Sequence, residues 1–107
     1  MNWKNEDKQN LVKAFLAFKT IGETQAFLRD LMTEDEIKEF ANRLKAARML
    51  SEKIPYSAIV KATGLSSTTV ARVSKWLKGP LGGYKTILNR LHRRNQHSRA
   101  EIGRGRF

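Results

Sequence analysis

The sequence predicts an all-α protein that contains a helix-turn-helix. Apolar residues recur at helical spacing along most of the 107 residues, and no segment shows the alternation of a half-buried strand. Thr33 and Glu36 have the spacing of a capping box, which marks the start of a helix. Gly64 lies between two short apolar segments, where the chain must reverse. Together these features indicate a small helical domain.

Three helices are expected in the first half of the chain. The first covers about residues 6–19 and carries a broad apolar stripe of Leu11, Val12, Phe15, Leu16 and Phe18. Thr20 and Glu23 predict the start of a short second helix, although Gly22 weakens this box. The box at Thr33 opens the longest helix, about residues 34–52, with one apolar face formed by Ile37, Phe40, Ala41, Leu44 and Ala47. Pro55 interrupts the chain after it.

Residues 56–78 have the features of a helix-turn-helix. Ile59 and Val60 would face the core from the first helix, Gly64 suits the turn, and Leu65 follows as its buried anchor. Ser66 or Ser67 would cap the second helix, which Val70 and Val73 would hold against the body. The side chains that remain outward are short, polar or basic, and we expect them to contact DNA: Ser67, Thr68, Thr69, Ala71, Arg72 and Lys75. Lys61 on the first helix and Ser66 at the cap are expected to contact DNA as well.

The chain after this motif is expected to hold one more helix and a basic tail. Gly79-Pro80 stops the preceding helix, and Trp76 and Leu77 before it are expected to make core or dimer contacts. The last helix, about residues 82–92, would pack through Tyr84, Ile87, Leu88 and Leu91. We therefore expect a helical domain over residues 1–92 and a disordered Arg/Gly-containing tail over residues 93–107.

The positive charge is confined to the second half of the chain. Residues 1–52 carry nine Lys or Arg and nine acids, whereas residues 53–107 carry twelve Lys or Arg and only Glu101, which accounts for the whole net charge of +11. Lys61, Arg72, Lys75 and Lys78 have no acidic partner within the motif. This distribution favours a neutral scaffold joined to a surface for a polyanion, with nucleic acid ahead of an acidic membrane surface or an acidic protein.

Composition argues against several other classes. There is no Cys, no apolar run long enough to span a membrane, and no signal-peptide core, so a cytoplasmic protein is expected. The two imidazoles, His92 and His97, lie beside arginines, and neither a metal-ligand cluster nor a catalytic triad is present. We expect no enzymatic activity, no metal and no cofactor.

Three segments resemble the tryptophan repressor family: Leu31-Met32-Thr33-Glu34-Asp35-Glu36, Asn42-Arg43-Leu44 and Gly64-Leu65-Ser66-Ser67-Thr68-Thr69-Val70-Ala71-Arg72. The similarity covers about residues 27–92. It implies a six-helix fold whose first helices intertwine with those of a second subunit, and a paired helix-turn-helix that reads a palindromic operator. It also implies base reading at Ser67, Thr68, Thr69 and Ala71, with Ser57 and Lys78 nearer the DNA backbone.

The resemblance also bears on an effector. Thr33, Arg43 and Arg72 match family positions that surround the tryptophan corepressor. Val73 and Trp76 stand where the family has a glycine and a small serine, and both add bulk to the expected cavity. We therefore expect no tryptophan binding. On that view Arg43 is a helix-face charge and Arg72 contacts a phosphate.

The function predicted is a sequence-specific transcriptional regulator, a repressor, that binds double-stranded operator DNA as a homodimer. One alternative is non-specific RNA or nucleoid binding through the Arg/Gly tail, with the helical domain serving for dimerisation. Another is a phage or ribosome-associated packing protein. The alternatives predict similar affinity for any polyanion.

Overall fold

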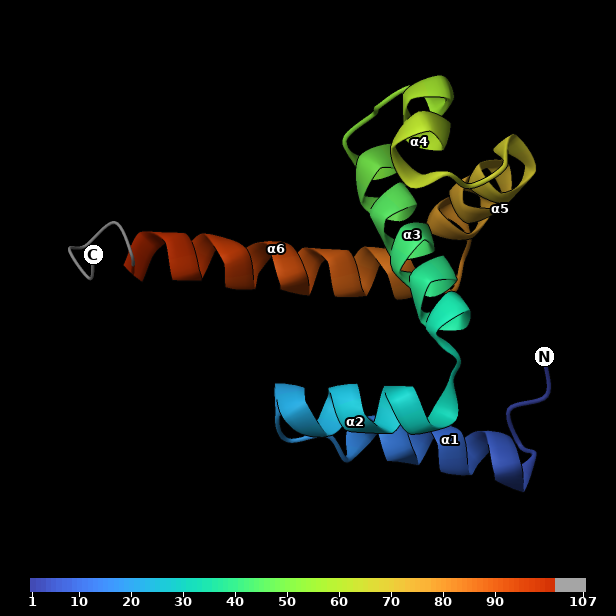
Figure 1. The fold of residues 1–107 in the computed structure, drawn as a ribbon, viewed down its shortest axis with the longest axis vertical. Helices are drawn as coiled ribbons and strands as arrows, with labels where there is room; N and C mark the ends of the chain where they lie inside the picture. Colours follow the sequence, from blue (N-terminus) through green and yellow to red (C-terminus); the bar gives the residue numbers. More distant parts are fainter. Residues whose placement is uncertain (102–107) are drawn as a thin grey trace. The chain divides into compact units, whose positions relative to one another are not determined.

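The structure, a computed structural model, describes residues 1–101 and the side chains of residues 1–95. Within that part it has six α-helices and no strand, as the sequence predicts (Figure 1). They are α1 (Glu6–Leu16), α2 (Ile21–Leu31), α3 (Glu34–Ser51), α4 (Tyr56–Thr63), α5 (Ser67–Lys78) and α6 (Gly83–Glu101). The chain divides into two compact units, Met1–Lys38 and Glu39–Phe107. Among the described residues, no helix combines the length and apolar character that crossing a membrane requires.

The first unit is built on the α1–α2 hairpin. The Asn5 side chain caps α1 by accepting from the Lys8 amide at 3.1 Å. The helix ends at Leu16 rather than near residue 19, which places Phe18 in the turn. There the Phe18 ring lies 5.4 Å from the ring of Phe15 and 5.6 Å from that of Phe27, centroid to centroid. Phe18 therefore contacts both α1 and α2, instead of extending the apolar stripe of α1 as predicted.

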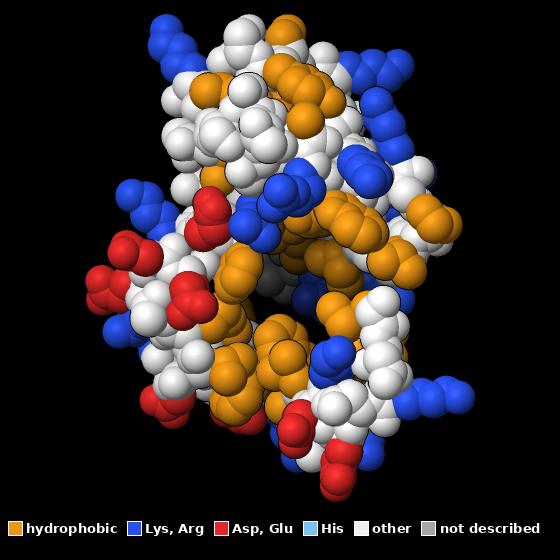
Figure 2. All heavy atoms as spheres, turned by 90° about the vertical axis from the view of Figure 1, so that its right-hand side faces the viewer, with side chains coloured by type: hydrophobic (Ala, Val, Ile, Leu, Met, Phe, Trp, Pro, Cys, Tyr) orange, Lys and Arg blue, Asp and Glu red, His pale blue; other side chains and the backbone are white. Residues whose placement is uncertain are grey.

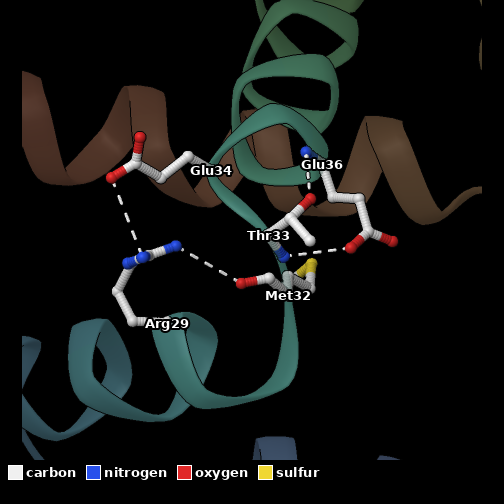
Figure 3. A network of polar contacts seen from close by, with 5 residues as sticks. All are labelled: Arg29, Met32, Thr33, Glu34 and Glu36. Atoms are coloured by element: carbon white, nitrogen blue, oxygen red, sulfur yellow. Dashed lines mark hydrogen bonds and ion pairs between the residues drawn. The ribbon is translucent and has the colours of Figure 1, made fainter.

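The two predicted capping boxes both start helices. The Glu23 amide donates to Thr20 Oγ1 at 3.1 Å at the start of α2. At the start of α3 the box is reciprocal: the Glu36 amide donates to Thr33 Oγ1 at 3.1 Å, and the Thr33 amide donates to Glu36 Oε1 at 3.0 Å (Figure 3). The Thr33 backbone N–H, followed by its hydroxyl, lowers the pKa of the Glu36 carboxyl below its ordinary value of 4.5. The box is therefore formed with a charged Glu36 at neutral pH.

Arg29 connects the end of α2 to the start of α3. Its guanidinium donates to the Met32 carbonyl at 3.4 Å and lies 3.7 Å from the Glu34 carboxylate (Figure 3). Both side chains of this ion pair are largely exposed, so the pair adds little stability. The Arg29 side chain instead orders the turn. It satisfies the Met32 carbonyl at the end of α2 and holds the Glu34 carboxylate at the start of α3.

The core lies in the second unit and centres on the helix-turn-helix. Its buried members come from α3, α4, the turn and α5, namely Ala46, Ala47, Met49, Ile59, Leu65, Val70 and Val73. Ile59 and Val70 are the largest side chains with no exposed surface. Leu77, near the end of α5, is also buried. Partly buried residues surround this cluster, among them Leu50, Ile54, Val60, Tyr84 and Leu88.

The face of α3 that enters this core differs from the one predicted. Of the five residues expected on the apolar face, only Ala47 belongs to the core, and Phe40 and Leu44 remain exposed. The helix has two apolar sides, and the side with Ala46, Ala47 and Met49 is buried in the core. The larger apolar side of α3 is left uncovered.

The last helix is longer than expected. Tyr84 and Leu88 pack against the core, whereas Ile87 and Leu91 remain exposed. The helix continues to Glu101, beyond the boundary at residue 92 where a disordered tail was expected to begin. Residues 93–101 contain no glycine or proline, so nothing in the sequence stops the helix there. The rest of the expected tail, residues 102–107 with Gly103 and Gly105, lies outside the described residues.

The turn between α4 and α5 is fixed by Gly64 and Thr63. Gly64 adopts the left-handed conformation (φ 74°, ψ 3°), and its amide donates to the Val60 carbonyl at 2.8 Å. The buried Thr63 hydroxyl donates to the Ile59 carbonyl at 2.7 Å and accepts from the Leu65 amide at 3.2 Å. One side chain thus satisfies a carbonyl of the first helix and an amide of the turn, and it sets where α5 can begin.

We expect a Thr63→Val substitution to lower the free energy of unfolding by roughly 1–3 kcal/mol, because it preserves shape but leaves the buried Leu65 amide unsatisfied. Urea denaturation followed by circular dichroism measures this loss. The matched control is Thr86→Val on the exposed surface of α6, where a change below roughly 0.5 kcal/mol is expected. Equal losses in the two variants would contradict a role for Thr63 in the turn.

Candidate nucleic-acid interface

Helix α5 has one buried face and one exposed face. Val70, Val73, Ser74 and Leu77 are buried. Most of the intervening positions are exposed and carry short or basic side chains: Ser67, Thr68, Ala71, Arg72 and Lys75. Trp76, nearer the end of the helix, is also exposed. The division follows from the helical period, because residues three and four apart share a face. Burial of the valines and Leu77 therefore directs the other residues into solvent.

The first turn of α5 is capped by Ser66. The Thr69 amide donates to Ser66 Oγ at 3.1 Å, and the Ser66 hydroxyl donates to Thr69 Oγ1 at 3.0 Å. Thr69 is half-buried, and its hydroxyl is engaged in the cap. Ser67 and Thr68 are exposed, and no hydrogen bond in the described part of the chain involves their hydroxyls. At the start of this helix, Ser67 and Thr68 are thus the residues free to contact a partner.

The basic residues predicted to contact DNA are exposed on both helices. Lys61 lies in the last turn of α4, and Lys75 and Lys78 lie in the last turn of α5. The two ion pairs of the described chain involve Arg29 and Arg43 instead, so these lysines and Arg72 have no acidic partner there. Ser57 is exposed in the first turn of α4. No acidic side chain is visible at the top of Figure 2, where α4 and α5 lie.

The three residues expected near an effector are divided between the two units. Thr33 belongs to the first unit, where its amide and hydroxyl are both used in the capping box. Arg43 and Arg72 belong to the second unit, on α3 and α5.

Of the two residues expected to fill an effector cavity, Val73 is a member of the buried core, and Trp76 is 50% exposed. The bulk of Val73 is therefore accommodated by the core.

Arg43 is held by neighbours on its own helix. Its Nε lies 3.8 Å from Glu39 Oε2, and its guanidinium lies 5.5 Å from the centroid of the Phe40 ring. Arg43 Nε is buried without a hydrogen-bond partner among the described residues, since the Glu39 oxygen is beyond hydrogen-bonding distance. Glu39 was not among the predicted residues, although its spacing of four residues from Arg43 is typical of an ion pair on one helix face.

Thr63 positions the turn but was not predicted to do so. The sequence pattern indicated Gly64 and Leu65 as turn residues and gave no role to the threonine before them. A threonine at a helix end has one available signal, because its hydroxyl can bond the carbonyl four residues back. In the structure the Thr63 hydroxyl donates such a bond to the Ile59 carbonyl, and it also accepts a hydrogen bond from the Leu65 amide.

Comparison with known proteins gives consistent matches. Residues 6–92 match the family model described as Trp repressor protein. An uncharacterised Bacillus subtilis protein, YerC, is 34% identical over 88 residues, which cover 82% of this chain and 85% of that protein. A crystal structure of a TrpR-like protein from Eubacterium eligens superimposes with a TM-score of 0.79 at 32% identity, covering 84% of this chain and 93% of the other.

A Staphylococcus aureus protein provisionally described as a Trp repressor superimposes with a TM-score of 0.78 at 28% identity, over 86% of this chain and 95% of the other. The family match spans most of the chain and includes α1 to α5 completely. With the six-helix fold and the helix-turn-helix described above, these matches show that the chain belongs to the Trp repressor family.

Proposed function

We propose that this protein is a sequence-specific DNA-binding transcriptional regulator, a repressor, that acts in the cytoplasm by binding operator DNA as a homodimer. The observation that carries the proposal is the exposed face of α5, which is short-chained at its start and basic along its length. A helix with such a face can lie close to base edges in the major groove while its lysines contact phosphates. Membership of the Trp repressor family supports the same conclusion.

In this proposal, base reading and backbone binding fall to different residues. Ser67, Thr68 and Ala71 face the bases, because they lie at the exposed start of α5. Thr69 lies at the edge of this group, since Ser66 already engages its hydroxyl. The backbone contacts come from longer or more distant side chains, namely Ser57, Lys61, Arg72, Lys75 and Lys78.

We expect Thr68→Ala and Lys78→Ala to weaken DNA binding in different ways. Loss of the Thr68 hydroxyl should change the preference among operator variants by roughly 1 kcal/mol at one base pair and leave the salt dependence unchanged. Loss of the Lys78 charge should weaken binding to all duplexes alike and reduce the slope of log K against log salt by about one unit. Competition binding across a panel of duplexes, repeated at several salt concentrations, measures both effects.

The same experiment tests the alternative of non-specific nucleic-acid binding. That alternative places the binding on the Arg/Gly tail, residues 93–107, which includes the exposed Arg93 and Arg94. It predicts equal affinity for all duplexes and for RNA, no effect of Thr68→Ala, and loss of binding when residues 93–107 are removed. That combination of results would contradict reading by α5.

A homodimer is proposed because the α1–α2 hairpin cannot bury its own apolar residues. No residue of α1 or α2 is buried, although the two helices carry Leu11, Val12, Phe15, Leu16, Ile21 and Leu31, with Leu16 81% exposed. Hydrophobic side chains are visible at the surface in the lower part of Figure 2, where these helices lie. A contiguous apolar surface of this kind marks an interaction site, and a second copy of the chain would also present a second helix-turn-helix.

We expect the protein to sediment as a dimer at micromolar concentration in analytical ultracentrifugation. A Leu11→Lys variant should shift the equilibrium toward monomer, because it places a charge in the buried interface. Asn10→Lys is the matched control, since Asn10 is a polar, exposed position on the same helix. A wild-type protein that sediments only as a 12.3 kDa monomer would contradict the dimer.

We further propose that tryptophan is not the effector. Val73 is packed in the core, so the space that a glycine would leave open at this position is filled. Isothermal titration with free tryptophan should show no binding heat, and operator affinity should be the same with and without it. A micromolar dissociation constant for tryptophan would contradict this proposal.

A further inference from the structure

A hollow in the second unit lies beside the helix-turn-helix. It is bounded by the end of α3, the α3–α4 turn, the first residue of α4 and the last turn of α5. Its volume is about 400 Å³, which falls within the range of small-molecule sites in proteins. None of Thr33, Arg43 and Arg72, the residues predicted to surround a corepressor, lines it.

The walls and rim of the hollow differ in character. Leu50, Ile54 and Leu77 form an apolar wall, while Lys53 and Lys78 carry two exposed positive charges, and no Asp or Glu belongs to the lining. An apolar wall alone would suit a neutral hydrocarbon, and lysines alone would suit any anion. Together they suit a molecule with an apolar body and one negatively charged group.

Ser74 adds an unused polar group to the lining. The residue is 4% exposed, and no hydrogen bond in the described part of the chain involves its hydroxyl. The Ser74 hydroxyl is not one of the buried polar atoms that lack a partner among the described residues, so it is accessible from the hollow, where it can donate to a ligand oxygen. Helix α4 also begins at the hollow with Tyr56, and its N-cap, Pro55, provides no side-chain cap for the first amides.

From these features we infer that the hollow is an effector site for a small monocarboxylic acid with a compact aromatic or aliphatic body. The carboxylate is held by Lys53 and Lys78, with the Ser74 hydroxyl as a further donor. The apolar body lies against Leu50, Ile54 and Leu77. The apolar wall distinguishes this class from inorganic phosphate or a DNA phosphate, which would leave that wall exposed to water.

The site would regulate DNA binding through Lys78, and this part of the inference rests on the proposed function. Lys78 lines the hollow and is also proposed to contact the DNA backbone. A bound carboxylate that pairs with Lys78 removes this charge from the DNA contact. The acid would therefore lower the affinity for all duplexes alike and leave the preference among operator variants unchanged.

Binding is tested first without DNA, by NMR titration of the full-length, isotopically labelled protein. The probes are benzoate, phenylacetate and hexanoate, each paired with its neutral amide, and inorganic phosphate. At least one acid should give saturable shift changes at Ile54, Tyr56, Ser74 and Leu77, with no comparable change from its amide or from phosphate. The Lys53→Met, Lys78→Met double variant should bind that acid about tenfold more weakly, since each exposed ion pair contributes up to roughly a factor of five.

Lys75→Met is the matched control, because Lys75 is exposed on the same helix but does not line the hollow. The inference is overturned if no acid gives saturable shifts up to its solubility limit, if the amides or phosphate act equally, or if Lys75→Met weakens binding as much as the double variant. The regulatory part is then tested by DNA competition with the acid at saturation; unchanged affinity would overturn it. Failure of the proposed function would appear differently, as absence of duplex preference before any acid is added.

Discussion

The packing of α4 against α5 around the fully buried Ile59 and Val70 is the constraint on which the rest of the second unit depends. The two side chains belong to one buried cluster with Ala46 and Ala47 of α3. Once Val70 and Val73 are inside, the 3.6-residue period leaves no choice about which positions of α5 face solvent. The proposed DNA surface is thus a consequence of the core.

The turn between α4 and α5 sets the direction and the start of α5. Gly64 provides the positive φ that reverses the backbone, and Thr63 bonds to both sides of the reversal. Ser66 then caps α5 and draws the Thr69 hydroxyl into the cap. A single short segment therefore fixes the direction of α5, its first residue and the side chains at its start that remain free. The separation between Ser66 and Thr69, which form the cap, and Ser67 and Thr68, which do not, follows from this local geometry.

In the first unit, local interactions define the helices, but little apolar surface is buried. Its helices are well started by Asn5, Thr20 and Thr33, and its turns are fixed by the Phe18 ring and by Arg29. Local interactions of this kind define helices but bury little apolar surface, and no residue of α1 or α2 is buried. The hydrophobic effect contributes to stability only when such a surface is covered. The proposed homodimer would supply that cover.

The sequence by itself determined the class of fold, the starts of the helices and the position of the helix-turn-helix. These features depend on interactions within a few residues, such as the Thr33–Glu36 box, the glycine at the turn and the apolar spacing of Ile59, Val70 and Val73. Only the tertiary structure decided which side of α3 enters the core. It also decided that the Phe18 ring contacts both α1 and α2, and that Ser74, Lys53 and Lys78 line the same hollow. Helix α3 is apolar on two sides, and its local pattern favours the side with the larger residues, which is not the side that is buried. The choice depends on which neighbouring helix packs there, and residues distant in sequence provide that neighbour.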